Sequence, residues 1–543
     1  MNRILPYSPD RTSGRAPSRQ ETEVMGTFSF SDRDLKQIQD RGLTPEQVLL
    51  QIETFKKGFP YSRLNRPCTA GDGIQVLSTS DLRKFAALHE EGALAGRTMK
   101  FVPASGAASR MFKSFLAVHS LHQTITDTEI SGDQDSDHRA VQEFLRGLHQ
   151  FAFVEDLRSA MARDSLDLNE VLEKREYKPI LEYLLTPKGL NLANAPKGLI
   201  KFHSYPGHSR TPCEEHLVEG AAYTKDSQGR VRIHFTVSPE HETSFRRHVQ
   251  RTVPLYEKGG LAFKVEFSTQ KTSTDTLAVG MDNEPFRDKD GALVFRPGGH
   301  GALLENLCDL SGDIIFIKNI DNVAPDRLKQ ETVVYKKALG GLLIELQKEI
   351  FTRIKTLTAS KGDRKLVGET ADFIKNRLLI MVPDRFDGFS RDEQLRFLVS
   401  RLNRPLRVCG MVRNQGEPGG GPFWVEHPDG TCSLQIVESS QVDLASLRQR
   451  KILQSSTHFN PVDLVCGVRD HEEKPFDLRR FVNPQTGLIS IKSKDGQELK
   501  ALEHPGLWNG AMAGWTTVFV EVPLSTFSPV KTINDLLRKE HQG

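Results

Sequence analysis

Short apolar runs alternate with amphipathic helical patterns through the middle of this chain, and the alternation restricts its fold more than any other feature. The runs have the length of buried strands, and the patterns between several of them repeat apolar residues at helical spacing. Strands joined by helices form an α/β sheet with ligand-binding loops at the strand ends. We therefore predict an α/β fold. The expected strands are 99–103, 198–203, 232–237, 262–267, 292–295 and 313–318, and the expected helices are 212–222, 242–253 and 300–310.

The length of 543 residues predicts several domains, or one large α/β domain with additions. After a disordered tail over 1–25, we expect a helical segment over 26–97, an α/β core over 98–400 and an α+β part over 401–543. A helical stretch over about 114–190 interrupts the core as an insertion, and its acidic sequence at 132–138 predicts an exposed loop. Further helices are expected at 31–57, 80–91, 325–358 and 374–404, and from Thr532 onward.

Charge, cysteine content and hydropathy argue against several classes of protein. The 73 Lys and Arg residues against 70 Asp and Glu give a net charge of +3, without the concentrated basic face that a nucleic-acid partner requires. The six cysteines lack CxxC spacing, which favours reduced thiols. The cluster His208, Glu214, Glu215 and His216 lacks zinc-ligand spacing. With no membrane span or signal-peptide pattern, we expect a soluble, cytoplasmic protein without a specific protein partner.

The loop Pro103-Ala-Ser-Gly-Ala-Ala-Ser-Arg-Met111 follows directly on a predicted strand. Small residues let backbone N–H groups approach a phosphate without obstruction by Cβ atoms, and Arg110 adds a bidentate donor. The same composition also fits a tight strand-to-helix turn. The Walker pattern is absent from the sequence and the dinucleotide pattern G-x-G-x-x-G does not form in this loop, so a P-loop or NAD site is disfavoured.

This loop and the segments after it resemble, in order, motifs of the nucleotidyltransferases that make nucleotide sugars. Ser105 and Gly106 stand at the paired glycines of the L-x-G-G-x-G-T-R-[LM] signature, and Ala108 stands at the third glycine. Five similar segments follow in the same order. They are 194–200, similar to the P-K motif, 236–243, similar to M-T-S-x-x-T, 265–270, similar to F-x-Q, 296–301, similar to P-x-G-[HN]-G, and 317–322, similar to the strand end that holds the metal.

Three later segments resemble motifs of the UDP-N-acetylhexosamine pyrophosphorylases. They are 435–441, similar to V-V-E-Y-S-E, 458–461, similar to the start of F-N-x-N, and 526–531, similar to F-S-P-[VL]-K. The resemblance spans about residues 100 to 535 and implies a divergent bacterial branch of the UDP-sugar pyrophosphorylase superfamily. It also implies a Rossmann-like mixed sheet of the nucleotide-diphospho-sugar transferase type, with the nucleotide on 98–400 and the sugar on 401–543.

The resemblance further implies a set of site residues with Mg²⁺ as the cofactor. Arg110, Lys197 and Lys531 would be catalytic, and Asp321 would hold Mg²⁺. Glu438 and Asn460 would contact the sugar, and the glycine-rich segment 416–421 would be a hairpin loop or a flap over it. The implied nucleotide-binding residues are Ser105, Gly106, Ala107, Ala108, Ser109, Gln270, Gly299, His300 and Gly301.

The implied reaction joins a nucleoside triphosphate, expected to be UTP, to a sugar-1-phosphate and releases pyrophosphate. Two alternatives stay open. A glycosyltransferase would consume a nucleotide sugar and hold its metal on an Asp-x-Asp motif, a spacing that occurs at 32–34, 133–137 and 288–290 in polar surroundings. A non-catalytic nucleotide-sugar-binding protein would fit the loss of loop glycines at Ser105 and Ala108.

Overall fold

The computed structural model describes residues 29–106, 108–127, 130, 135–360, 362–416 and 420–542. The expected disordered tail over 1–25 and part of the expected acidic loop, 132–134, lie outside these residues. Within the described part of the chain, no helix combines the length and the apolar character needed to cross a bilayer.

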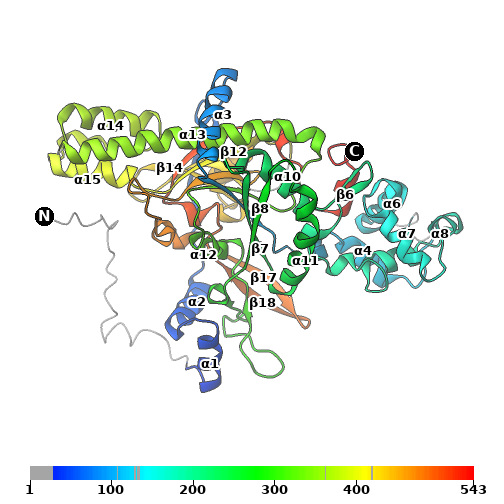
Figure 1. The fold of residues 1–543 in the computed structure, drawn as a ribbon. Coiled ribbons are helices and arrows are strands. Elements are labelled where there is room, and N and C mark those ends of the chain that lie inside the picture. Colours follow the sequence, from blue (N-terminus) through cyan, green and yellow to red (C-terminus); the bar gives the residue numbers. More distant parts are fainter. Residues whose placement is uncertain are drawn as a thin grey trace.

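A ten-stranded sheet forms the centre of the molecule (Figure 1). Within it, β16 is antiparallel to both of its neighbours, β15 is antiparallel to β12, and the other neighbouring strands are parallel. The predicted α/β fold with a mixed sheet is confirmed. In spatial order the strands are β2 (Thr69–Ala70), β3 (Gly73–Gln75), β19 (Thr516–Glu521), β12 (Leu406–Arg413), β16 (Asp463–Gly467), β11 (Ile314–Lys318), β4 (Thr98–Pro103), β7 (Arg230–Val237) and β8 (Ala262–Thr269), and β15 (His458–Phe459) pairs with β12.

Helices cover both faces of this sheet because side chains along a buried strand alternate between the faces. In β11, Ile314 and Phe316 pack into the apolar core under the long helix α13, whereas Ile315 and Ile317 pack into the core beside α12. The helices on the first face are α3 (Thr79–Leu94), α10 (Pro212–Thr224), α11 (Pro239–Tyr256) and α13 (Asp326–Ala359), and the opposite face carries α12 (Leu303–Cys308).

The predicted helical insertion lies at one end of the molecule, drawn in cyan in Figure 1, and its helices surround a separate apolar core that Val530, Ile533 and Leu536 of the C-terminal segment also enter. Its helices are α4 (Lys113–Leu121), α6 (Ser136–Gly147), α7 (Val154–Ala162), α8 (Leu168–Lys174) and α9 (Lys178–Leu185). At the other end, α14 (Arg364–Asn376) and α15 (Arg391–Leu402) pack against α13.

Smaller elements surround the sheet. The N-terminal helices α1 (Asp32–Asp40) and α2 (Pro45–Lys57) lie beside the hairpin β17 (Leu488–Lys494) and β18 (Gln497–Glu503) in Figure 1. The remaining elements are the sheet of β1 (Leu64–Pro67), β13 (Gly421–Glu426) and β14 (Cys432–Val437), the pairs β5 (His203–Tyr205) with β6 (His208–Arg210) and β9 (Thr276–Leu277) with β10 (Phe295–Arg296), and α16 (Leu447–Gln454).

Several predicted elements differ in the structure, and the helical stretch expected at 31–57 is two helices, α1 and α2. The predicted strand at 198–203 is wrong, because a 3-10 turn over Lys197–Leu199 occupies its start and Gly198 packs where an added Cβ would lie 2.7 Å from Phe245. The predicted strand at 292–295 shrinks to β10, and the predicted helix at 374–404 is broken after Asn376, where Leu379 has a φ of +54°. The helix expected from Thr532 is a five-residue 3-10 turn, Ile533–Leu537.

A buried ion network joins the two central strands β4 and β11. The Glu219 carboxylate lies 3.0 Å from the Lys100 ammonium and 2.9 Å from the Lys318 ammonium. Burial alone would raise the pKa of Glu219, but the two lysine charges hold that pKa well below its usual value. Burial lowers the pKa of Lys100 to about 7. Glu219 therefore holds together the strands that lead to the phosphate-loop candidate and to Asp321.

Removing this carboxylate should destabilise the fold. We expect Glu219→Gln to lower the free energy of unfolding by about 3–5 kcal/mol, because two buried ammonium groups lose their counter-charge. Glu173→Gln, an exposed change on α8, should stay within about 0.5 kcal/mol. Equilibrium denaturation in urea measures both. A loss below about 1 kcal/mol for Glu219→Gln would contradict a charged network.

Candidate functional site

The loop after β4 lies at the edge of the sheet where the parallel strands end. Its first backbone amide, that of Ala104, donates to the Thr236 carbonyl of β7 at 2.7 Å. Ala108 is buried and begins a 3-10 turn that ends at Arg110. Ser105, Gly106, Ser109 and Arg110 are exposed, and Ala107 lies outside the described residues. An added Cβ at Gly106 would meet no atom of the described residues within 4 Å, and these residues leave this side of the loop open to a ligand.

The segment that carries Lys197 is attached to this loop through the backbone. The Lys197 amide donates to the Gly106 carbonyl at 3.3 Å, and the Ala108 amide donates to the Ala195 carbonyl at 3.1 Å. The helical insertion separates these segments in the sequence, yet it leaves and re-enters the core at neighbouring points. The structure thus places Lys197 beside the loop.

Three residues that the sequence singled out converge at this edge. The Lys197 ammonium lies 3.0 Å from Oδ2 of Asp321 and also donates to the Val530 carbonyl at 2.9 Å. The Lys531 ammonium lies 4.0 Å from the same carboxylate oxygen. The side chains of Lys197 and Asp321 are each 13% exposed, whereas that of Lys531 is 64% exposed. Two lysines with one carboxylate leave a positive charge for an anionic ligand.

The turn that presents Asp321 is fixed by a residue that the sequence patterns did not assign to the site. His216 of α10 is fully buried, and its Nε2–H donates to the carbonyls of Asn319 and Ile320 at 3.2 and 3.3 Å. Burial holds the pKa of His216 well below its usual value, so the imidazole is neutral. The sequence offered no signal for this contact, because histidine beside glutamate suggested only a metal ligand.

The residues predicted to hold the base lie at the same edge, beyond β8. Gln270 follows β8, and its side-chain nitrogen is buried without a hydrogen-bond partner in the described part of the chain. His300 stacks on Trp508 with ring centroids 4.2 Å apart and accepts a hydrogen bond from the Leu507 amide. Burial lowers the pKa of His300 to about 4. His300 is therefore neutral, and packing explains its position.

The glycines on either side of His300 are also explained by packing. Gly299 has a φ of +74°, and an added Cβ there would lie 2.8 Å from Oε2 of Glu503. An added Cβ at Gly301 would lie 2.2 Å from the Pro505 carbonyl oxygen. Only glycine fits these two positions, whether or not a base binds against the turn.

The two predicted sugar-contact residues lie on either side of Gly420. The Asn460 amide donates to the Gly420 carbonyl at 2.8 Å, and an added Cβ at Gly420 would lie 3.3 Å from Cγ of Glu438. Burial raises the pKa of Glu438, and the charge of Glu503 adds to the effect. Residues 417–419 of the predicted flap lie outside the described residues. Glu438 and Asn460 are thus brought together.

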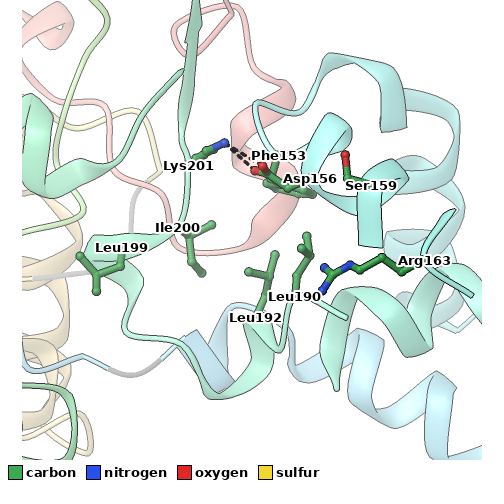
Figure 2. Close-up of a pocket in the computed structure, with 9 residues that line it drawn as sticks. All are labelled: Phe153, Asp156, Ser159, Arg163, Leu190, Leu192, Leu199, Ile200 and Lys201. Carbon is green, nitrogen blue, oxygen red and sulfur yellow. Dashed lines mark hydrogen bonds and ion pairs between the residues drawn. The ribbon is translucent and has the colours of Figure 1, made fainter. Parts of the chain in front are cut away.

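Two surface hollows lie apart from the predicted site residues. One hollow has a volume of about 350 Å³ and lies between α7 and the segment 190–201. Figure 2 shows that leucines line it and that the Lys201–Asp156 ion pair lies at one side. The other, of about 460 Å³, lies against Gly280 and Phe286. Neither lining includes a predicted site residue. The convergence of charges at the strand ends is therefore the better candidate for an anion site.

The site should bind polyphosphate without a nucleoside. We expect Lys197→Met to weaken binding of tripolyphosphate about tenfold, because a charge-assisted hydrogen bond contributes about 1.5 kcal/mol or more. Lys365→Met, which removes a lysine whose side chain is 84% exposed on α14, serves as the matched control and should leave the affinity unchanged. Titration calorimetry at fixed salt measures both. Equal affinities for the two variants would rule out Lys197 as a phosphate ligand.

Comparison with known proteins finds one family and several solved structures that match this chain. The model of the family described as "Domain of unknown function (DUF4301)" matches residues 31–542. No curated protein matches the sequence. A UDP-glucose pyrophosphorylase from Leishmania major is 12% identical, with a TM-score of 0.43, over 95% of this chain and 82% of that one. A uridine diphosphate N-acetylglucosamine pyrophosphorylase from Trypanosoma brucei is 12% identical, with a TM-score of 0.44, over 94% and 85% of the chains.

Proposed function

This chain belongs to the DUF4301 family, and we propose that it is a nucleotidyltransferase that joins a nucleoside triphosphate to a sugar-1-phosphate and releases pyrophosphate. One observation carries the proposal: Lys197, Asp321 and Lys531 meet beside the loop 103–111 at the carboxyl edge of the sheet. The order of the motifs along the chain supports it, because each of the three residues lies in a separate segment that resembles a nucleotidyltransferase motif, and the three segments converge in the fold.

The reaction needs positioning and charge more than acid–base chemistry. A sugar-1-phosphate oxygen attacks the α-phosphorus of the triphosphate in line, the bond from that phosphorus to the bridging oxygen breaks, and pyrophosphate leaves. The attacking oxygen is already anionic, so no general base is required. In the proposal, the loop amides and Arg110 hold the β- and γ-phosphates, while Lys197 and Lys531 neutralise charge at the reacting phosphates.

Asp321 fits Mg²⁺ as a single carboxylate ligand. Among the described residues, no group of three or more His, Cys, Asp or Glu could hold a metal by itself. Mg²⁺ commonly binds through one or two carboxylates together with substrate phosphates, so one carboxylate beside a phosphate loop suffices. When bound, the ion would supply further neutralisation of phosphate charge. The role of this chain is to hold Asp321 beside the loop through His216 and Lys197.

Base and sugar would occupy opposite sides of the phosphates. The amide nitrogen of Gln270, which has no hydrogen-bond partner among the described residues, can donate to a carbonyl oxygen of uracil, and we therefore propose UTP as the nucleotide. Glu438 and Asn460 flank Gly420 and would accept and donate hydrogen bonds with sugar hydroxyl groups. Ser105, Gly106, Ala107, Ala108 and Ser109 remain the proposed phosphate loop, and Gly299 to Gly301 the proposed wall of the base site.

The direct test is release of pyrophosphate. We expect the protein with UTP, Mg²⁺ and one member of a panel of sugar-1-phosphates to release pyrophosphate and form the nucleotide sugar, and Asp321→Ala to abolish the release. Transfer or hydrolysis of a UDP-sugar without pyrophosphate chemistry would overturn the proposal in favour of a glycosyltransferase. Binding of UTP or a UDP-sugar without any turnover would overturn it in favour of a binding protein.

The phosphate-binding cations should act mainly on the transition state. We expect Arg110→Ala and Lys531→Ala each to lower kcat/KM by the equivalent of about 2–4 kcal/mol, because each removes a preorganised charge. Lys365→Ala on the remote helix α14 should leave kcat/KM within about twofold of the wild type. Steady-state kinetics of pyrophosphate release measure all three. Equal effects at Lys365 and Lys531 would contradict the assignment.

Gln270 should determine the choice of base. We expect Gln270→Ala to lower kcat/KM for UTP about tenfold or more and to reduce the preference for UTP over CTP, because a hydrogen bond to the base is lost. The control is Gln150→Ala, an exposed change in the insertion. Competition between the two nucleotides in one assay measures the preference directly. An unchanged preference would remove Gln270 from the base site.

A further inference from the structure

We infer that Asn322 is a positioning residue that holds the segment bearing Lys531 against Asp321. The inference rests on the proposed function, which gives Lys531 its role at the phosphates. Asn322 directly follows Asp321, so one dipeptide would both face the substrate and attach the C-terminal segment. Sequence motifs place this asparagine only next to the metal-ligand candidate.

Backbone and side chain of Asn322 both take part in the attachment. Asn322 forms an antiparallel bridge with Pro529. Its Oδ1 accepts a hydrogen bond from the Ser528 amide at 3.0 Å, between residues 206 positions apart. One residue earlier, the Asp321 carbonyl accepts from the Val530 amide at 3.1 Å. Lys531 is the next residue after Val530, so the register of this short pairing fixes the position of the Lys531 backbone.

The attachment is buried, which makes its polar groups expensive to disturb. Asn322 is 2% exposed and Ser528 is 5% exposed. A buried amide that loses its acceptor is bonded neither to the protein nor to water, so the full free-energy cost of its desolvation is no longer offset. In an Asn322→Ala variant, the Ser528 amide would lose its acceptor. The segment that contains Ser528 would then lower its free energy by moving away from position 322 until water reaches that amide. Lys531, whose side chain is largely exposed, would lose the support of the residues that precede it.

The rest of the C-terminal segment has anchors of its own. The Asp535 carboxylate accepts from the amides of Lys531 and Thr532, both at 2.7 Å. Ile533 and Leu536 belong to the apolar core of the insertion. Near the end of the chain, His541 stacks on His203 with ring centroids 5.3 Å apart. Loss of the Asn322 contact should therefore loosen residues 528–530, which precede Lys531, without detaching the segment or unfolding the protein.

Lys197 is a competing tether that the experiment must separate from Asn322. Its ammonium bridges the Asp321 carboxylate and the Val530 carbonyl, so it also holds the segment. Lys197 is placed at the phosphates by the proposal, which makes its substitution uninformative about positioning. The proposal gives Asn322 no contact with the phosphates, and its side-chain oxygen is used by the Ser528 amide, whereas its Nδ2 has no hydrogen-bond partner among the described residues. A variant of Asn322 therefore tests attachment when exchange at the Ser528 amide is measured together with the activity.

A double-mutant cycle on kcat/KM tests whether Asn322 acts through Lys531. We expect Asn322→Ala to lower kcat/KM for pyrophosphate release about tenfold or more in the wild type, and by less than about twofold in the Lys531→Ala background. Asn169→Ala, a change of an exposed asparagine on α8, is the matched control and should have no effect. If the effects of Asn322→Ala and Lys531→Ala multiply, Asn322 acts independently of Lys531 and the inference is wrong.

Hydrogen exchange gives a readout that does not depend on catalysis. We expect Asn322→Ala to raise the exchange rates of the Ser528 and Val530 amides about tenfold, while that of Thr532, held by Asp535, stays unchanged. Unchanged exchange at Ser528 would overturn the inference whatever the activity. Faster exchange at Ser528 with no pyrophosphate release from the wild type would instead support the attachment and reject the proposed function. Equal acceleration at Thr532 would show general loosening and also overturn the inference.

Discussion

The candidate site depends on one buried interaction, the pairing of the Glu219 carboxylate with the ammonium groups of Lys100 and Lys318. The two lysines lie on β4 and β11, and these strands end in the phosphate-loop candidate and in the turn to Asp321. Three charges are withdrawn from water here, which is favourable only while all of them stay paired. The network therefore couples the spacing of the two strand ends to the integrity of the core.

Above this network, the charge of the site comes from side chains that water reaches. Burial keeps His216 and His300 neutral, so each supports its neighbours through hydrogen bonds and packing. Lys197 and Lys531 share the Asp321 carboxylate, and Arg110 lies exposed on the adjoining loop. Buried, neutral histidines beside partly exposed cationic side chains suit an anionic ligand, because the packed histidines do not need to reorganise when the ligand binds.

Local sequence patterns were sufficient to predict the regular strands and helices of the core. They failed where contacts with residues distant in the sequence determine the backbone conformation. The apolar runs of β7, β8 and β11 and the Thr44–Pro45 start of α2 are visible in the sequence, because burial and capping leave short-range patterns. The segment 198–203 carries the same apolar pattern as a strand. Its start instead belongs to a 3-10 turn over Lys197–Leu199, where Phe245 and Ile320 pack closely over Gly198, and His203 at its end begins β5.

The sequence by itself determined which kinds of residue could bind phosphate and in what order they occur, because small residues after a strand and single charges beside prolines are local features. Only the tertiary structure decided that Lys197, Asp321 and Lys531 meet. Lys197 and Asp321 are 124 positions apart, and Lys197 and Val530 are 333 apart. The supports at His216 and Asn322 were equally invisible, since a hydrogen bond between distant segments has no local pattern and exists only once the chain has folded.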